Sequence, residues 1–256
     1  MGRGKEKMNE LTAVYFMWKR ELIRFFRAKS RVVGSLGMPF FFLAVLGTSM
    51  GGVFPSGNGS YLDFIMPGVL AMVLLFGSVF SGIIVIMDRQ FGFLKETLVA
   101  PVSRTSIVLG KALGGATTAV LQGLIMMGLA ILLGANVDLT YFPLVLLLMA
   151  VISMSFVSLG IALGSVMEDM HGFQLIMNFL VMPMFFLSGA VFPLTSAPEI
   201  VRGISYFDPM TYAVDALRLL LTGSASMPLA WSAAVLAGFF ALNLVLAAYL
   251  FGRIES

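Results

Sequence analysis

The chain has 256 residues, of which 59% are hydrophobic and 11% are charged, whereas an average globular protein is about 45–50% apolar and about 25% charged. This composition excludes an intrinsically disordered chain, and the absence of cysteine excludes a small secreted fold held by disulfides. It also removes the thiolate as a metal ligand or nucleophile. The remaining class is an integral membrane protein.

Six apolar stretches are long enough to cross a membrane, since about 20 such residues form a helix that spans a hydrocarbon core about 30 Å thick. They lack the period of two that marks a transmembrane β-barrel. We therefore predict an all-α integral membrane protein in which residues 1–256 form a single domain. The predicted spans are 32–54, 63–87, 107–133, 143–167, 173–192 and 230–251.

Lysine and arginine are unevenly distributed among the connections. Of the 16 basic residues, 14 precede the first span, lie at or near the connection between the second and third, or follow the last. Only Arg202 and Arg218 fall on the other side. Since cytoplasmic segments retain an excess of basic residues, we predict a multi-pass protein of the cytoplasmic membrane with both termini in the cytoplasm.

Residues 9–31 are predicted to form an amphipathic helix ahead of the first span. Large apolar side chains, including Trp18, recur every three or four residues on one face, and Arg20, Arg24 and Arg27 recur on another. This pattern is typical of an interfacial helix whose arginines lie beside anionic lipid headgroups. The helix is either a simple topology anchor or also a contact for a cytoplasmic partner.

The spans are predicted to contain almost no ionisable groups. Asp63 and Asp88 fall at the two ends of the second span, and Lys111 falls near the start of the third. This disfavours an ion-coupled carrier, which uses intramembrane carboxylates. The sequence before Gly110-Lys111 is not a nucleotide-binding P-loop, and the single histidine, His171, has no triad motif or metal-ligand set around it. We therefore predict no enzyme activity, no metal and no nucleic-acid partner.

The connection 88–106 is the longest on the cytoplasmic side. It contains the following candidate partner-binding residues: Phe91, Leu94, Lys95, Glu96, Leu98, Pro101 and Arg104. The three large apolar residues among them share one helical face, and the proline ends the turn. Such a short amphipathic helix either docks into a groove on a soluble partner or rests on its own bundle and the lipid.

Residues 193–223, on the opposite side, are predicted to form two short helices. Ser196 and Glu199 have the spacing of a capping box, which starts the first helix. Asp208 and Pro209 have the character of an N-cap and a first helical residue, which start the second.

The second short helix is predicted to end near Gly223 and to carry Tyr212, Asp215 and Arg218 among apolar neighbours. Asp215 and Arg218 are three residues apart, a spacing that allows them to pair. Charged groups in such surroundings indicate a helical hairpin that re-enters the outer leaflet, covered by protein or lining a cavity. It serves either as an outward gate or as a structural cap.

Both connections resemble those of ABC-2 type permeases. The stretch from Lys95 through Pro101 to Arg104 is similar to that family's cytoplasmic coupling region, and Pro209…Tyr212…Asp215…Arg218 is similar to its second hallmark. The likeness covers nearly the whole chain in order and is to the branch of daunorubicin-resistance and nodulation exporters. The family often has Asn where Asp208 stands, a difference that preserves the N-cap.

The resemblance implies the transmembrane subunit of an ATP-driven exporter. Its partners would be two copies of a cytoplasmic ATP-binding subunit, which hold ATP and Mg, and a second permease copy, expected to form a homodimer in the bilayer. Residues 91–104 would lie in the ATPase groove, and this chain would hold no cofactor. The charge-poor path favours a drug- or lipid-like amphipathic substrate moving outward, as in multidrug efflux. The alternatives are a polysaccharide or glycolipid permease and a passive channel or scaffold without an ATPase.

Overall fold

The computed structural model describes residues 10–49, 60–92 and 102–253. All the regular elements in these ranges are helical: α1 (Glu10–Arg27), α2 (Lys29–Phe41), the π-helix η1 (Phe42–Leu46), α3 (Gly47–Ser49), α4 (Tyr61–Val79), α5 (Ser81–Gln90), α7 (Arg104–Leu132), α8 (Phe142–Val166), α9 (Met170–Leu187), the 3₁₀ helix η2 (Leu194–Ser196), α10 (Glu199–Ser205), α11 (Pro209–Thr222) and α12 (Leu229–Gly252). Six helical segments are long and apolar enough to cross a membrane, which confirms the predicted class. The first combines α2, η1 and α3, and the second combines α4 and α5.

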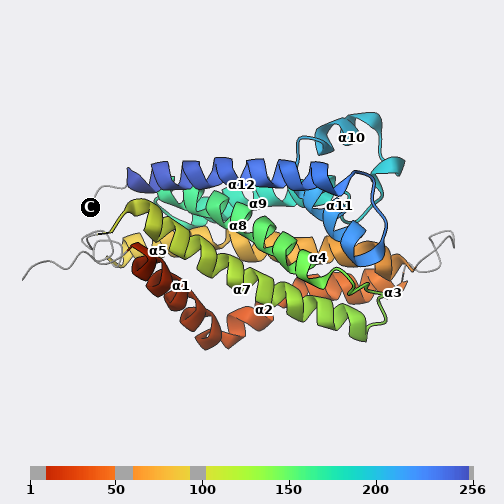
Figure 1. Cartoon of the computed structure of the whole chain (residues 1–256), viewed down its shortest axis with the longest axis horizontal. Coiled ribbons are helices and arrows are strands. Elements are labelled where there is room, and N and C mark those ends of the chain that lie inside the picture. The colour runs from red at the N-terminus through yellow and green to blue at the C-terminus, as the bar shows by residue number, and fades with distance from the viewer. Residues whose placement is uncertain (1–9, 50–59, 93–101, 254–256) are drawn as a thin grey trace, which may run out of the picture.

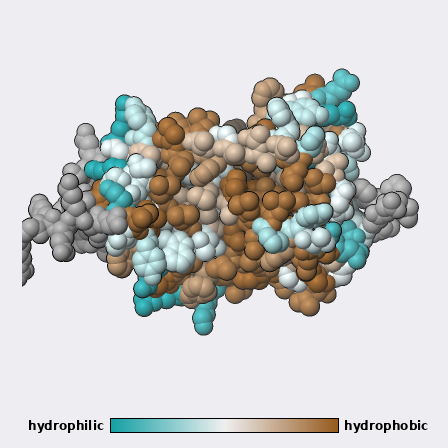
Figure 2. Space-filling view, viewed as in Figure 1, coloured by the Kyte–Doolittle hydropathy of each residue, from teal (hydrophilic) through white to brown (hydrophobic). Residues whose placement is uncertain are grey.

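The spans run along the long axis of the molecule (Figure 1). The start of α1, the end of α5, the start of α7 and the end of α12 lie together at one end, here named the basic end; α10 and α11 lie toward the opposite end, here named the hairpin end. On the visible surface, hydrophobic residues cover the middle and hydrophilic residues gather toward both ends (Figure 2). This is the distribution expected of a bundle whose middle lies in hydrocarbon.

Local capping groups set several of the helix boundaries. The Asp208 carboxylate accepts from the Met210 amide at 2.9 Å, Pro209 is the first residue of α11, and Gly223 ends that helix in the left-handed conformation at φ 71°. These starts and stops were predicted. The capping box predicted at Ser196 is wrong, because Ser196 lies in η2 and the extended residue Pro198 precedes α10 instead.

Glycines let α8 pack closely on the second span at the point where α4 passes into α5. A Cβ at Gly160 would collide with the Val79 backbone, and one at Gly164 would collide with the Gly82 backbone. Because these contacts are between backbones, a side chain cannot be accommodated by a rotamer change. The pair therefore serves packing within the chain.

Three predicted boundaries differ in the structure. The helix predicted at 9–31 divides at Ala28, so the residues from Lys29 belong to α2. The fifth span ends at Leu187 rather than at 192, since the chain turns at Gly189 with φ 77°. The connection predicted at 88–106 is shorter than expected, because residues 88–90 continue α5 and α7 begins at Arg104.

Candidate functional site

A cavity of about 680 Å³ is lined by residues of α1, α2, η1, α4, α5, α7, α8 and α9. This is within the ~300–1,000 Å³ typical of small-molecule sites. Six phenylalanine rings contribute to its wall: Phe25, Phe42, Phe76, Phe80, Phe185 and Phe186. Pro39 lies in the last turn of α2, and Phe42 is the first residue of the π-helix that follows it. An irregular first span thus forms part of the wall.

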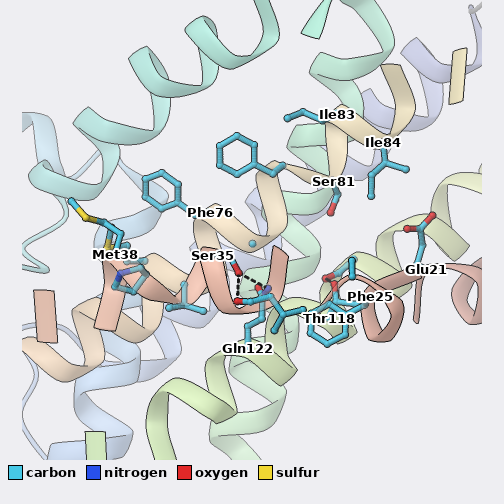
Figure 3. A pocket seen from close by; sticks show the side chains of 18 of the residues that line it. Glu21, Phe25, Ser35, Met38, Phe76, Ser81, Ile83, Ile84, Thr118 and Gln122 are labelled. Carbon is cyan, nitrogen blue, oxygen red and sulfur yellow. Dashed lines mark hydrogen bonds between the residues drawn. The ribbon is translucent and has the colours of Figure 1, made fainter. Parts of the chain in front are cut away.

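Apart from the hydroxyls of Ser81 and Thr118, the polar groups of this wall occupy two places (Figure 3). In the middle, Gln122 Nε2 of α7 donates to Ser35 Oγ of α2 at 2.9 Å, and Ser35 Oγ donates to the Val32 carbonyl at 2.9 Å. Toward the basic end lie Glu21, Arg24 and Lys111. The cavity is therefore an apolar chamber with charge at one end.

The charged end belongs to a buried cluster, here named the charge cluster, that joins three helices. Asp88 of α5 accepts from Lys111 Nζ of α7 at 2.5 Å and from Arg20 Nη2 of α1 at 2.7 Å. Arg24 Nη2 lies 3.5 Å from Asp88, and its Nη1 lies 3.6 Å from Glu21 Oε2. Asp88 and Lys111 are each only 4% exposed. Both charges lie near the span ends at which the sequence placed them, but their burial and their pairing were not predicted; each charge is kept in the interior by its partner.

Helix α1 packs against α7 through two glycines of that helix. A Cβ at Gly110 would collide with Met17, and one at Gly114 would collide with Glu21. Trp18 Nε1 donates to Thr117 Oγ1 of α7 at 3.1 Å. The small-residue spacing of four lets the two helices approach closely.

This packing corrects the expected orientation of the first helix. Trp18, Arg20 and Arg24 bind groups of α5 and α7, whereas the pattern predicted arginines beside lipid headgroups. The acidic partner Asp88 is far away in the sequence, so the helix pattern alone did not reveal it. Arg27, in the last turn of α1, is exposed, and its lipid contact stays a prediction.

At the hairpin end, Asp215 and Arg218 bind different groups, so the predicted pair is wrong. Asp215 accepts from the amides of Ser226 and Met227 at 2.7 and 3.1 Å. Arg218 donates to the Gly189 carbonyl at 3.0 Å and lies over the Phe64 ring at 4.2 Å. Each side chain therefore ties α11 to a separate neighbouring segment.

Most of α11 is buried, and burial shifts the pKa of charged groups there. Burial raises the pKa of the Asp208 carboxyl to about 7, although the bond from the Met210 amide favours the ionised form. Burial lowers the pKa of Arg218 to about 10, while the nearby Asp215 carboxylate opposes that shift. Tyr212 donates to the Tyr206 carbonyl at 2.8 Å, which holds α11 against the chain that leads into it.

The sequence profile of ABC-2 type transporters matches residues 12–222, which is most of the chain and includes both the charge cluster and α11. The chain belongs to the ABC-2 type transporter family. It is the transmembrane permease subunit, a class that has no ATPase domain of its own. ABC-2 permeases pair in general with separate ATP-binding subunits.

Named relatives resemble this permease over most of their length. It is 28% identical over 236 residues to the putative transport permease ycf38 of Cyanophora paradoxa, an alignment that covers 86% of this chain and 80% of the relative. It is 27% identical over 211 residues to nodulation protein J of Rhizobium leguminosarum bv. viciae, with 81% of each chain covered. It is 24% identical over 231 residues to the inner membrane transport permease YadH of Escherichia coli, with 89% and 90% covered.

The structure describes only part of the permease's predicted coupling segment. Phe91, directly after α5, is 64% exposed at the basic end, and Arg104 begins α7 at the same end. Five of the predicted partner-binding residues lie outside the described residues: Leu94, Lys95, Glu96, Leu98 and Pro101. Asp88 and Lys111 lie close to the two ends of this segment. The charge cluster therefore connects the end of α5 and the start of α7 to α1.

The permease's cavity residues were not predicted as a group. Glu21 in particular was missed, because it lies among basic residues in a helix assigned to the membrane surface. Two signals were present in the sequence: opposite charges near the facing ends of consecutive spans, at Asp88 and Lys111, and the glycines at 110 and 114. Within the described part of the chain, no group of three or more potential metal ligands comes together.

Proposed function

We propose that this permease moves an amphipathic drug- or lipid-like substrate outward across the cytoplasmic membrane, driven by a separate ATP-binding subunit. The observation that carries this proposal is the cavity of about 680 Å³, largely apolar and bounded by membrane-spanning helices. Its charged end suits a polar headgroup and its phenylalanine-rich wall suits an apolar body. Such a chamber accepts an amphiphile better than a fully hydrated solute.

The ATP-binding subunit, in two copies that hold ATP and Mg, is proposed to dock on the connection between α5 and α7, with Phe91 and Arg104 at its borders. The exposed Phe91 ring supports this, since an apolar side chain at a hydrophilic end of the bundle is suited to insertion into a partner groove. The charge cluster connects the end of α5 and the start of α7 to α1. A force that the ATP-binding subunit applies to the connection would therefore move α1, α5 and α7 together.

The basic end is proposed to face the cytoplasm, with both termini there. The asymmetry of lysine and arginine supports this orientation, and a relative bears the name of an inner membrane permease. Because the chain has no cysteine, single cysteines introduced at Arg253, after α12 at the basic end, and at Ser196, at the hairpin end, can be tested for labelling by an impermeant reagent added outside. Protection of the first and labelling of the second from outside would support the orientation, and the reverse would overturn it.

A second copy of the permease is proposed to pack against the side of the bundle formed by α2 and α9. Both helices contribute to the cavity wall, and α9 exposes large apolar side chains, among them Leu175 at 71% and Phe179 at 84%. A homodimer there would enclose the path between two equivalent chambers. Cysteine cross-linking at Phe179 would support this arrangement, and a monodisperse, active monomer would overturn it.

The decisive experiment reconstitutes the permease with its cognate ATP-binding subunit in liposomes. Substrate-stimulated ATP hydrolysis and ATP-dependent movement of an amphiphile are expected. Phe91→Asp should abolish co-purification of the subunit without loss of folding, whereas Phe207→Asp, at an exposed ring of the hairpin end, should not. Transport without any ATP-binding subunit would instead establish a passive channel.

A further inference from the structure

Glu21 is the buried acid in the wall of the cavity, and within the described part of the chain its carboxylate makes only long ion-pair contacts. Its residue is 7% exposed, and among the residues that the structure describes no donor bonds its Oε1. Its ion-pair distances are long, 3.9 Å from Oε1 to Arg20 and 3.6 Å from Oε2 to Arg24. The other carboxylate of the charge cluster, Asp88, holds the short contacts to Lys111 and Arg20.

The position of Glu21 is set by packing. A Cβ at Gly114 would collide with the Glu21 Cβ and Cγ, so the glycine makes room for the stem of this side chain against α7. The carboxylate beyond the stem lies in the wall of the cavity, at the end opposite Met38 (Figure 3). A carboxylate in such a position loses water contacts, and a ligand donor would compensate that loss.

The charge cluster contains three cations and two carboxylates, whereas its three most deeply buried members carry one excess negative charge. Asp88, Glu21 and Lys111 are more than nine-tenths buried, so two carboxylates face one ammonium. The side chains of Arg20 and Arg24 are 33% and 36% exposed and are therefore partly solvated, which weakens their attraction for Glu21. Glu21 Oε1, which no donor among the described residues bonds, is therefore the atom of the cluster that a positive group in the cavity can approach.

The remainder of the wall matches a cation with an apolar body. Phe25 and Phe80, like Phe76 and Phe186, line the same cavity, and aromatic faces attract organic cations most strongly where water is excluded. We propose that the cavity binds a lipophilic organic cation whose positive group contacts the Glu21 carboxylate and whose apolar part lies against the phenylalanine rings. The inference rests on the proposed function, for which it names the substrate class.

An anionic ligand fits this arrangement less well. It would approach Arg24 and Lys111, but both already contact Asp88, and it would bring a third negative charge next to Glu21 and Asp88. Sign of charge is therefore the property by which the site would select its ligand.

The test compares two probes of nearly the same shape and opposite charge, tetraphenylphosphonium and tetraphenylborate. Binding to the purified full chain in nonionic detergent is measured by equilibrium dialysis, with protein-free micelles as background. We expect saturable binding of tetraphenylphosphonium to one site per chain and at least about tenfold weaker specific binding of tetraphenylborate. Equal or tighter binding of the anion would overturn the proposal, and this comparison needs no variant.

Variants then assign the contact to one residue. Glu21→Gln removes the charge at nearly unchanged volume and should weaken tetraphenylphosphonium binding at least about tenfold. Glu168→Gln, the same change at an exposed position, should leave it unchanged. Wild-type affinity in a folded Glu21→Gln protein would contradict the assignment.

The same chemistry occurs in a free organic cation and in the choline headgroup of a lipid. Lysophosphatidylcholine added as a competitor separates them: displacement of the probe places the headgroup in the site, and persistence of the probe favours a free cation. Neither measurement uses the ATP-binding subunit. If tetraphenylphosphonium does not bind but Phe91-dependent docking of that subunit is observed, the substrate class is wrong and the exporter proposal stands. If tetraphenylphosphonium binds but the subunit does not dock, the exporter proposal is wrong and the cation site stands.

Discussion

The charge cluster offers the sharpest test of the structure, through removal of one charge at a time. Asp88→Asn leaves Lys111, only 4% exposed, without the carboxylate that accepts its 2.5 Å hydrogen bond. Lys111→Met instead leaves Asp88 with Arg20 at 2.7 Å and Arg24 at 3.5 Å. The two changes break the same ion pair, but they leave different amounts of uncompensated charge.

Their expected costs follow from that difference. At 2.5 Å and an effective dielectric constant of about 20, the ion pair contributes ~7 kcal/mol of Coulomb attraction, most of which offsets the desolvation of both groups. Loss of one partner of a buried pair costs about 3–5 kcal/mol, which we expect for Asp88→Asn. For Lys111→Met we expect about 1.5–3 kcal/mol, the range for a hydrogen bond to a charged group, since the arginines remain.

The double variant measures the coupling between the two residues. In the double variant both charges are absent. We therefore expect its loss of unfolding free energy to be smaller than the sum of the two single losses by at least about 2 kcal/mol. The assay is the free energy of unfolding from titration with sodium dodecyl sulfate in mixed micelles. Lys29→Met and Glu168→Gln, at exposed positions, are the matched controls. Single effects below about 0.5 kcal/mol that add without coupling would refute a buried cluster.

Three further predictions concern the hairpin end and the packing of the spans. Burial raises the pKa of Asp208 to about 7, above its unfolded value near 3.8. The stability that this shift contributes is therefore complete below pH ~4 and is lost as the pH rises through about 7. Asp208→Asn should keep the N-cap and remove this pH dependence. We therefore expect the unfolding midpoint of the variant to be constant between pH 5 and 8, whereas that of the wild type falls. Arg218→Lys keeps the charge but removes the planar donor group that reaches the Gly189 carbonyl. We expect transport by the reconstituted protein to fall while its membrane insertion persists. Normal transport would indicate that α11 is only a structural cap. Gly160→Ala should lower the free energy of unfolding by about 1–3 kcal/mol through collision with backbone, whereas Gly238→Ala, which meets open space, should not lower it.

Hydropathy sufficed to predict the six spans, because membrane crossing requires a long apolar stretch whatever its tertiary contacts. It failed at the end of the fifth span, where residues 188–192 are small or apolar and only the φ of 77° at Gly189 turns the chain. Capping was predicted correctly where it depends on adjacent residues, as at Asp208 and Pro209. It was wrong at Ser196, where the preceding turn decides the geometry.

The site was less predictable because its contacts join residues far apart in the sequence. Asp215 and Arg218 have the spacing of an intrahelical pair, yet each finds a partner that exists only after α11 packs, the amides after α11 for one and the Gly189 carbonyl for the other. Arg20 likewise binds an acid 68 residues away. Sequence spacing gives the side chains that one helix can bring together, and tertiary packing then decides which of those pairs form.

The cavity and the charge cluster share Glu21, Arg24 and Lys111, and this sharing constrains how the proposed transport cycle can work. A force applied to the connection between α5 and α7 reaches Asp88 and Lys111 first, since they stand near its two ends. Any shift of those side chains alters the charges that face Glu21, because Arg20 and Arg24 contact both carboxylates of the cluster. If a cation is bound at Glu21, the same shift changes its affinity, and by linkage the bound cation changes the ease of the shift. Stimulation of ATP hydrolysis by the substrate is then a direct consequence of the arrangement, and it should disappear in Glu21→Gln even where the basal rate does not change.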